Sequence, residues 1–75
     1  MENLVESNPK IMFGKPVIKG TRITVELILG KIADGETVDA ILSSYPHLTR
    51  EQVLACVDYA CQSLSLETVY PMATV

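Results

Sequence analysis

Three segments of the chain repeat apolar residues at the period of an α-helix, and each segment follows a threonine. The threonines are Thr24, Thr37 and Thr49, and a threonine hydroxyl accepts well from the free N–H groups of a helix's first turn. The apolar stripes behind them are Val25, Ile28, Leu29 and Ile32; Val38, Ile41, Leu42 and Tyr45; and Val53, Val57, Ala60, Cys61 and Leu64. Three such stripes joined by short links predict a compact three-helix core.

The ends of these helices carry their own signals. Gly35 stands where the first helix would take a left-handed C-terminal cap. Pro46 ends the second helix, because the residue before a proline avoids helical dihedral angles. Thr49 and Gln52 match a capping box, in which each side chain accepts from the other residue's backbone N–H.

The sequence before Thr24 lacks the helical period and contains two short runs typical of β-strands. Residues 16–18 (Pro-Val-Ile) and 21–23 (Thr-Arg-Ile) flank Lys19-Gly20, which predicts a small β-hairpin with Gly20 in its turn. The expected fold is therefore mostly α, a three-helix bundle with a short N-terminal β-hairpin. We divide this single domain into a basic hairpin segment (8–23), a helical core (24–64) and a C-terminal arm (65–75).

Composition indicates that this domain has a partner. The chain has 75 residues, of which 48% are hydrophobic, and one core of this size cannot hide them all. We expect part of the apolar surface to face another copy, giving a homodimer, or a partner protein.

We expect a cytoplasmic chain with no membrane contact, because no apolar run approaches the ~20 residues of a membrane span and the N-terminus does not resemble a signal peptide. Cys56 and Cys61 diverge on one helix, so we expect packing residues rather than a disulfide.

Enzyme chemistry is not indicated. The single histidine, His47, lies between Pro46 and Leu48 in a turn with no evident nucleophile, and the spacing of the two cysteines does not fit a zinc site. The glycines match no phosphate-binding loop. We expect no catalytic residue, no cofactor or metal, and no small-molecule substrate.

Binding to DNA is one interpretation of the charge pattern. Four of the six basic residues lie within 8–23, with no acidic residue among them. The second and third helices, joined by a tight turn, form a helix–turn–helix, whose third helix would present Arg50 and Gln52 to base edges. Lys15, Lys19 and Arg22 would then contact phosphates as a wing does.

The charge of the remaining chain favours an alternative. The net charge is −3, and from Ile32 onward one basic residue stands against six acidic ones. DNA readers normally bring several cations to the recognition helix. The alternative is that Arg50 and Gln52 form a solvated first turn and that the hairpin cations belong to an ordinary surface.

Two blocks of sequence resemble a known family. Residues 14–23 (Gly-Lys-Pro-Val-Ile-Lys-Gly-Thr-Arg-Ile) resemble the signature of a small prokaryotic family, domain-of-unknown-function family number 433, and residues 45–53, followed by Asp58 to Ala60, resemble its second block. The resemblance spans about residues 8 to 64. Phe13 stands where the family pattern suggests a second glycine, and Thr24 where proline is commoner.

The resemblance implies a homeodomain-like, winged helix–turn–helix fold. It also implies a role similar to VapB-type antitoxins, whose toxins are PIN-domain ribonucleases and which bind operator DNA. In that role the arm would contact the toxin through the apolar residues Leu66, Val69, Tyr70, Met72 and Val75, which could equally complete a dimer. The alternative is a protein-interaction module of the same fold with no nucleic-acid role.

Overall fold

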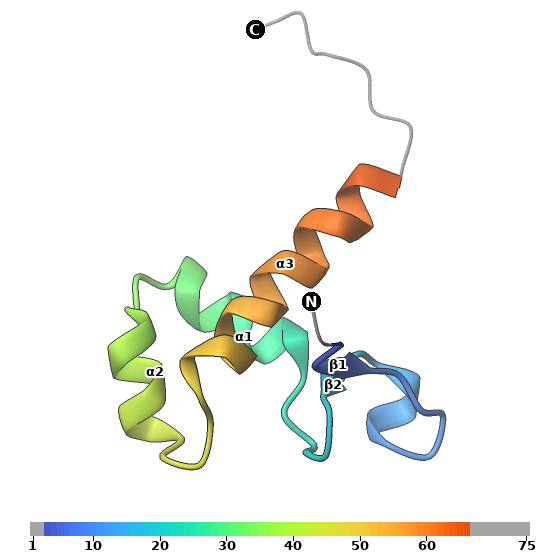
Figure 1. The fold of residues 1–75 in the computed structure, drawn as a ribbon, viewed down its shortest axis with the longest axis horizontal. Coiled ribbons are helices and arrows are strands. Elements are labelled where there is room, and N and C mark those ends of the chain that lie inside the picture. Colours follow the sequence, from blue (N-terminus) through green and yellow to red (C-terminus); the bar gives the residue numbers. More distant parts are fainter. Residues whose placement is uncertain (1–2, 67–75) are drawn as a thin grey trace, which may run out of the picture.

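The computed structural model describes residues 3–66 and contains three helices and one pair of short strands (Figure 1). The elements in chain order are β1 (Val5–Glu6), the short turn η1 (Met12–Gly14), β2 (Val17–Ile18), α1 (Val25–Ala33), α2 (Val38–Ser44) and α3 (Arg50–Leu66). The expected fold class, mostly α with three helices and an N-terminal antiparallel strand pair, is confirmed. No helix within residues 3–66 is both long enough and apolar enough to cross a bilayer.

The helices begin where the threonines predicted. The Thr24 hydroxyl accepts from the Leu27 N–H at 3.0 Å, and the Thr37 hydroxyl accepts from the Ala40 N–H at 3.1 Å. At α3 the capping box is reciprocal. The Gln52 N–H donates to the Thr49 hydroxyl at 3.2 Å, and the Thr49 N–H donates to Gln52 Oε1 at 2.8 Å. Each such cap stabilises its helix by about 1 kcal/mol.

The C-terminal signals are equally local. Gly35 has a φ of +97° and donates its N–H to the Ile32 carbonyl at 2.9 Å, as expected for a left-handed cap after α1. Helix α2 ends at Ser44, so Tyr45 leaves the helical region just before Pro46.

The strand pair differs in position from the expected hairpin. β2 pairs antiparallel with β1, with Val5 opposite Ile18 and Glu6 opposite Val17. The expected turn after Ile18 does form, since the Ile18 N–H donates to the Ile23 carbonyl at 2.9 Å. Residues 21–23 nevertheless form no strand, because the chain enters the α1 cap at Thr24 directly after them. The N-terminal segment supplies the strand instead.

A left-handed turn precedes β2. Met12, Phe13 and Gly14 follow one another with φ values of 50°, 59° and 83°. Two of the three are not glycine, although residues with a Cβ avoid this region at a cost of about 1–2 kcal/mol each. Phe13 therefore occupies a glycine-type conformation at the position where the family pattern suggested glycine.

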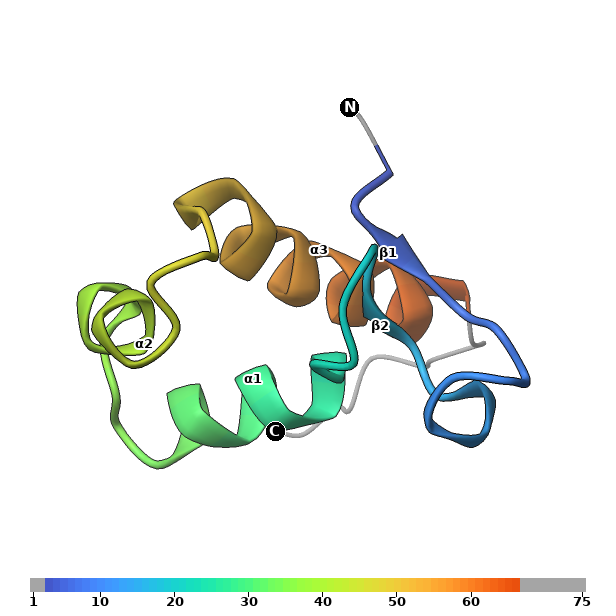
Figure 2. The same ribbon diagram turned by 90° about the horizontal axis from the view of Figure 1, so that it is seen from below.

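The core lies between the strand pair and the three helices (Figure 2). Its fully buried side chains include Ile18 of β2, Ile28 of α1 and Ile41 of α2. Helix α3 contributes Val53 and Cys56, both fully buried. Within residues 3–65 the buried apolar side chains are Val5, Val17, Ile18, Val25, Ile28, Ile41, Leu48, Val53, Ala55 and Cys56.

The expected inner face of α3 is wrong beyond Val53. Val57 and Leu64 are 41% and 63% exposed, and Cys61 is exposed as well. The buried cysteine is Cys56, and burial raises the pKa of its thiol to about 11. The reason is that Val53 and Cys56 set the face that meets the core, and Val57 and Cys61 lie about 100° and 140° around the helix from Cys56.

Candidate functional site

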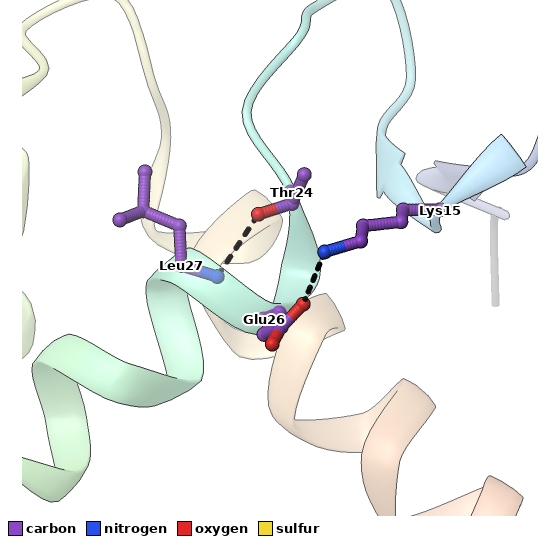
Figure 3. A network of polar contacts seen from close by, with 4 residues as sticks. All are labelled: Lys15, Thr24, Glu26 and Leu27. Carbon is purple, nitrogen blue, oxygen red and sulfur yellow. Dashed lines mark hydrogen bonds and ion pairs between the residues drawn. The ribbon is translucent and has the colours of Figure 1, made fainter. Parts of the chain in front are cut away.

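The basic side chains expected to bind phosphates do not act as one group. Lys15 lies just before β2, and its Nζ is 3.1 Å from Oε1 of Glu26 in the first turn of α1 (Figure 3). Both side chains are exposed, so the pair is weak, but it neutralises the lysine charge locally. A phosphate approaching Lys15 would also approach a carboxylate.

The two residues expected to read bases both have contacts within the chain. Arg50, the first residue of α3, forms an ion pair and hydrogen bond with Asp39 in the first turn of α2. Gln52 uses its side-chain oxygen in the capping box with Thr49. DNA would compete with the Asp39 carboxylate for Arg50, whereas the side-chain amide nitrogen of Gln52 takes no part in the capping box.

Lys19 and Arg22 remain as exposed cations. They lie in the turn between β2 and α1, and neither forms an ion pair with any of residues 3–66. This turn and the α2–α3 turn lie along the same edge of the molecule (Figure 1). One carboxylate reaches the turn, because Glu6 Oε2 accepts from the Gly20 N–H at 3.2 Å. The structure thus leaves two of the five expected DNA-binding side chains unpaired at this edge.

An apolar groove between α1 and the second half of α3 was not expected from the sequence. It has a volume of about 600 Å³. Leu29, Gly30 and Ala33 line it from α1, and Ala60 and Leu64 are among the residues that line it from α3. Lys15 and Glu26, the ion pair of Figure 3, also border it. We call this feature the α1/α3 groove.

The α1/α3 groove could have been anticipated in part. A 17-residue helix is about 25 Å long, whereas α1 has nine residues and α2 has seven. The end of α3 therefore extends beyond its neighbours (Figure 1). Apolar residues in that extension, such as Leu64, cannot all reach a core made by shorter helices. The length of the apolar pattern in α3 therefore indicated an exposed apolar surface, whereas the helical period of that pattern did not.

The proposed contacts of the C-terminal arm lie mostly outside the described residues. Val69, Tyr70, Met72 and Val75 fall beyond residue 66, and Leu66 is the last residue of α3. Among residues 3–66 no cluster of histidine, cysteine and acidic side chains could hold a metal ion.

Comparison with known proteins identifies the family. Residues 5–60 match the family described as "Protein of unknown function (DUF433)", a match that runs from β1 through most of α3. The chain belongs to the DUF433 family. The resemblance in the two sequence blocks is thereby confirmed, and the likeness to VapB-type antitoxins stays a prediction.

The chain is similar to one uncharacterised protein and to one DUF433 member of known crystal structure. "Uncharacterized protein y4eO" of Sinorhizobium fredii (strain NBRC 101917 / NGR234) is 35% identical over 57 residues, which are 76% of this chain and 26% of that protein. A crystal structure of a DUF433 member from Anabaena variabilis ATCC 29413 superposes with a TM-score of 0.79 at 28% identity, covering 85% of this chain and 63% of the other. This chain thus spans about a quarter of the first protein and under two thirds of the second.

Proposed function

We propose that this DUF433 domain acts by binding a protein in the α1/α3 groove, as the antitoxin of a toxin–antitoxin pair whose toxin is a PIN-type ribonuclease. The observation that carries the proposal is the groove itself. It is apolar, it is open to solvent, and no side chain of residues 3–66 fills its volume of about 600 Å³. Open apolar concavities with polar groups at the border are where apolar anchors of a partner bind.

The chemistry of the groove suits a helix or an extended segment of a partner. Gly30 and Ala33 are one turn apart on α1 and have small or no side chains, so a partner backbone can approach α1 closely. Leu29 and Leu64 offer apolar contacts from the two sides. The Lys15–Glu26 pair at the border supplies one charge of each sign, which can orient a polar partner group without a large desolvation penalty.

Electrostatics supports a ribonuclease as the partner. The chain carries a net charge of −3, and most of its described carboxylates are exposed. An enzyme that binds RNA presents a cationic surface, and opposite net charges accelerate association. An antitoxin of this kind acts in the cytoplasm, where its ribonuclease partner and the RNA cleaved by that ribonuclease are found.

Gly30 permits a clean test of the groove. A Cβ built on Gly30 meets no atom within 4 Å, and its backbone is helical, so Gly30→Glu should fold while extending a charged side chain into the groove. The matched control is Gly30→Ala, which adds one methyl group and stabilises α1 by about 1 kcal/mol. We would tag each variant at its own chromosomal locus and identify co-purifying proteins by mass spectrometry.

Three outcomes are informative. A stoichiometric small nuclease that binds the wild type and Gly30→Ala, and is lost with Gly30→Glu, supports the proposal. A nuclease retained by Gly30→Glu shows that the groove is not its site. Recovery of the chain with no nuclease in any sample refutes the antitoxin function.

DNA binding is a second candidate function, favoured by a specific observation. Lys19 and Arg22 are exposed, without an ion pair among the described residues, on the edge that also carries the α2–α3 turn (Figure 1). Two unpaired cations predict weak, strongly salt-dependent binding rather than tight operator recognition. Titration of duplex DNA at low salt tests this function independently of the groove.

A further inference from the structure

Helix α3 carries a second apolar surface that is distinct from its core face. Leu54, Val57, Cys61 and Leu64 follow one another at intervals of three, four and three residues, and we call them the outer stripe. All four are exposed: Leu54 is 49%, Val57 41% and Leu64 63% accessible, and Cys61 is in the exposed class. Three of these four are therefore large apolar side chains left in contact with water.

The outer stripe is not an extension of the core. An α-helix turns about 100° per residue, so the centre of the stripe lies roughly 60° around the helix from Val53 and roughly 120° from Cys56, which are both fully buried. Only Leu64 is shared with the lining of the α1/α3 groove. A cover on the outer stripe would therefore leave most of the groove accessible.

The spacing of the outer stripe matches that of a helix which packs against another helix. Intervals of three and four residues repeat every 3.5 residues, the pattern of the a and d positions in paired helices. The stripe itself contains no charged residue. The nearest charge, Asp58, accepts a hydrogen bond at 2.7 Å from Gln62 one turn further along the same helix.

We infer that the outer stripe is the interface of a homodimer in which α3 of one copy packs against α3 of a second copy. The occupant is a second copy because the stripe is complementary to itself. A two-fold axis brings the same patch of both chains together, and a seam of apolar residues at heptad spacing interdigitates with an identical seam. The four stripe residues carry no charge in a chain of net charge −3, and the carboxylate that flanks them, Asp58, accepts a hydrogen bond from Gln62 of its own helix.

The size of the interface sets its expected strength. From Leu54 to Leu64 the stripe extends over ten residues, or about 15 Å of helix. This is shorter than the seam of a stable coiled coil, and it falls at the small end of specific interfaces. We therefore expect a dimer with a dissociation constant in the micromolar range.

Two leucines of similar exposure make a matched test. Leu54 lies in the outer stripe and Leu27 lies on α1 outside it, and they are 49% and 43% exposed. Leu54→Glu should raise the dissociation constant of the dimer by at least about a hundredfold, because each dimer contains the change twice. Leu27→Glu should leave it within about twofold, since surface changes away from an interface have small effects. Sedimentation equilibrium on the full chain, over a range of concentrations around tens of micromolar, measures both.

Cys61 provides an independent measurement on the unaltered chain. Cys56 is fully buried and its thiol is neutral near pH 8, so a thiol reagent reports on Cys61 alone. Burial in the dimer should slow alkylation of Cys61 as protein concentration rises, and Leu54→Glu should abolish this dependence. A chain that stays monomeric at tens of micromolar overturns the inference. A dimer unaffected by Leu54→Glu, or weakened equally by Leu27→Glu, overturns it too.

Discussion

The exposed phenylalanine in the left-handed turn leads to a prediction opposite to the usual effect of glycine. Phe13 has a φ of 59° and a ψ of 30°, and its side chain is 96% exposed. A residue with a Cβ loses about 1–2 kcal/mol in this conformation, whereas glycine adopts it freely. Because the aromatic ring contacts little of the folded chain, its removal forfeits almost no packing. Phe13→Gly should therefore stabilise the protein.

The magnitude follows from two opposing terms. Relief of the left-handed strain raises the free energy of unfolding by about 1–2 kcal/mol. The greater conformational freedom of glycine in the unfolded chain lowers it by about 0.5–1 kcal/mol. The net gain in the free energy of unfolding is about 0.5–1 kcal/mol. For a domain of this size each kcal/mol raises Tm by about 4–8 °C, so the shift should be a few degrees.

The assay is urea unfolding of Phe13→Gly beside Phe13→Ala. Alanine also removes the exposed ring but keeps the Cβ in the left-handed region, so the difference between the two variants isolates the backbone contribution. We expect the glycine variant to be more stable by about 1 kcal/mol. At Leu27, in the first turns of α1, the same pair should give the opposite sign, with glycine less stable than alanine by about 1 kcal/mol. An alanine variant at position 13 as stable as the glycine variant would refute the reasoning.

Three further predictions use other parts of the structure. Replacing both Lys19 and Arg22 by glutamine should abolish low-salt binding of duplex DNA in a fluorescence titration, whereas Lys15→Gln, which removes a cation already paired with Glu26, should change it little. Thr49→Ala should lower the free energy of unfolding in urea by about 1 kcal/mol, through loss of the α3 cap. Burial raises the pKa of the Cys56 thiol from 9.0 to about 11, so the unfolded chain loses this proton first and stability should fall as pH rises between these values. Cys56→Val should remove that contribution from the pH dependence of urea unfolding.

The features that the sequence predicted are those determined by neighbouring residues. The three helix starts depend on a hydroxyl and an N–H three residues away, and all three hydrogen bonds form. The left-handed cap at Gly35 and the end of α2 before Pro46 are local in the same sense. Position 13 is a further local case. The family pattern suggests glycine there, and the backbone of Phe13 adopts the left-handed conformation that glycine favours.

The features that were missed depend on pairing across the chain. Residues 17–18 were expected to form a strand pair with the segment just after them. That pairing is limited to a Val17–Thr24 bridge and the Ile18–Ile23 hydrogen bond, and the strand partner is the segment of Val5 and Glu6, a dozen residues earlier. The ion pair of Arg50, one of the two expected base-reading residues, is likewise a contact across the chain. Nothing near Arg50 in the sequence indicates that Asp39 on α2 will face it, whereas the contact of Gln52 with Thr49 is local and was predicted as a capping box.

Helix α3 shows why periodicity alone could not separate the core from a surface. Val53, Val57, Ala60, Cys61 and Leu64 satisfy helical spacing as well as Val53 with Cys56 does, so the sequence is compatible with more than one inner face. The inner face is determined by the shorter helices α1 and α2, because their lengths limit how much of α3 they can cover. The apolar side chains of α3 that α1 and α2 do not cover lie in the α1/α3 groove or in the outer stripe. Among the described residues, Leu54, Val57 and Leu64 stay exposed on surfaces of this kind, and the two sets of variants, at Gly30 and at Leu54, measure each surface separately.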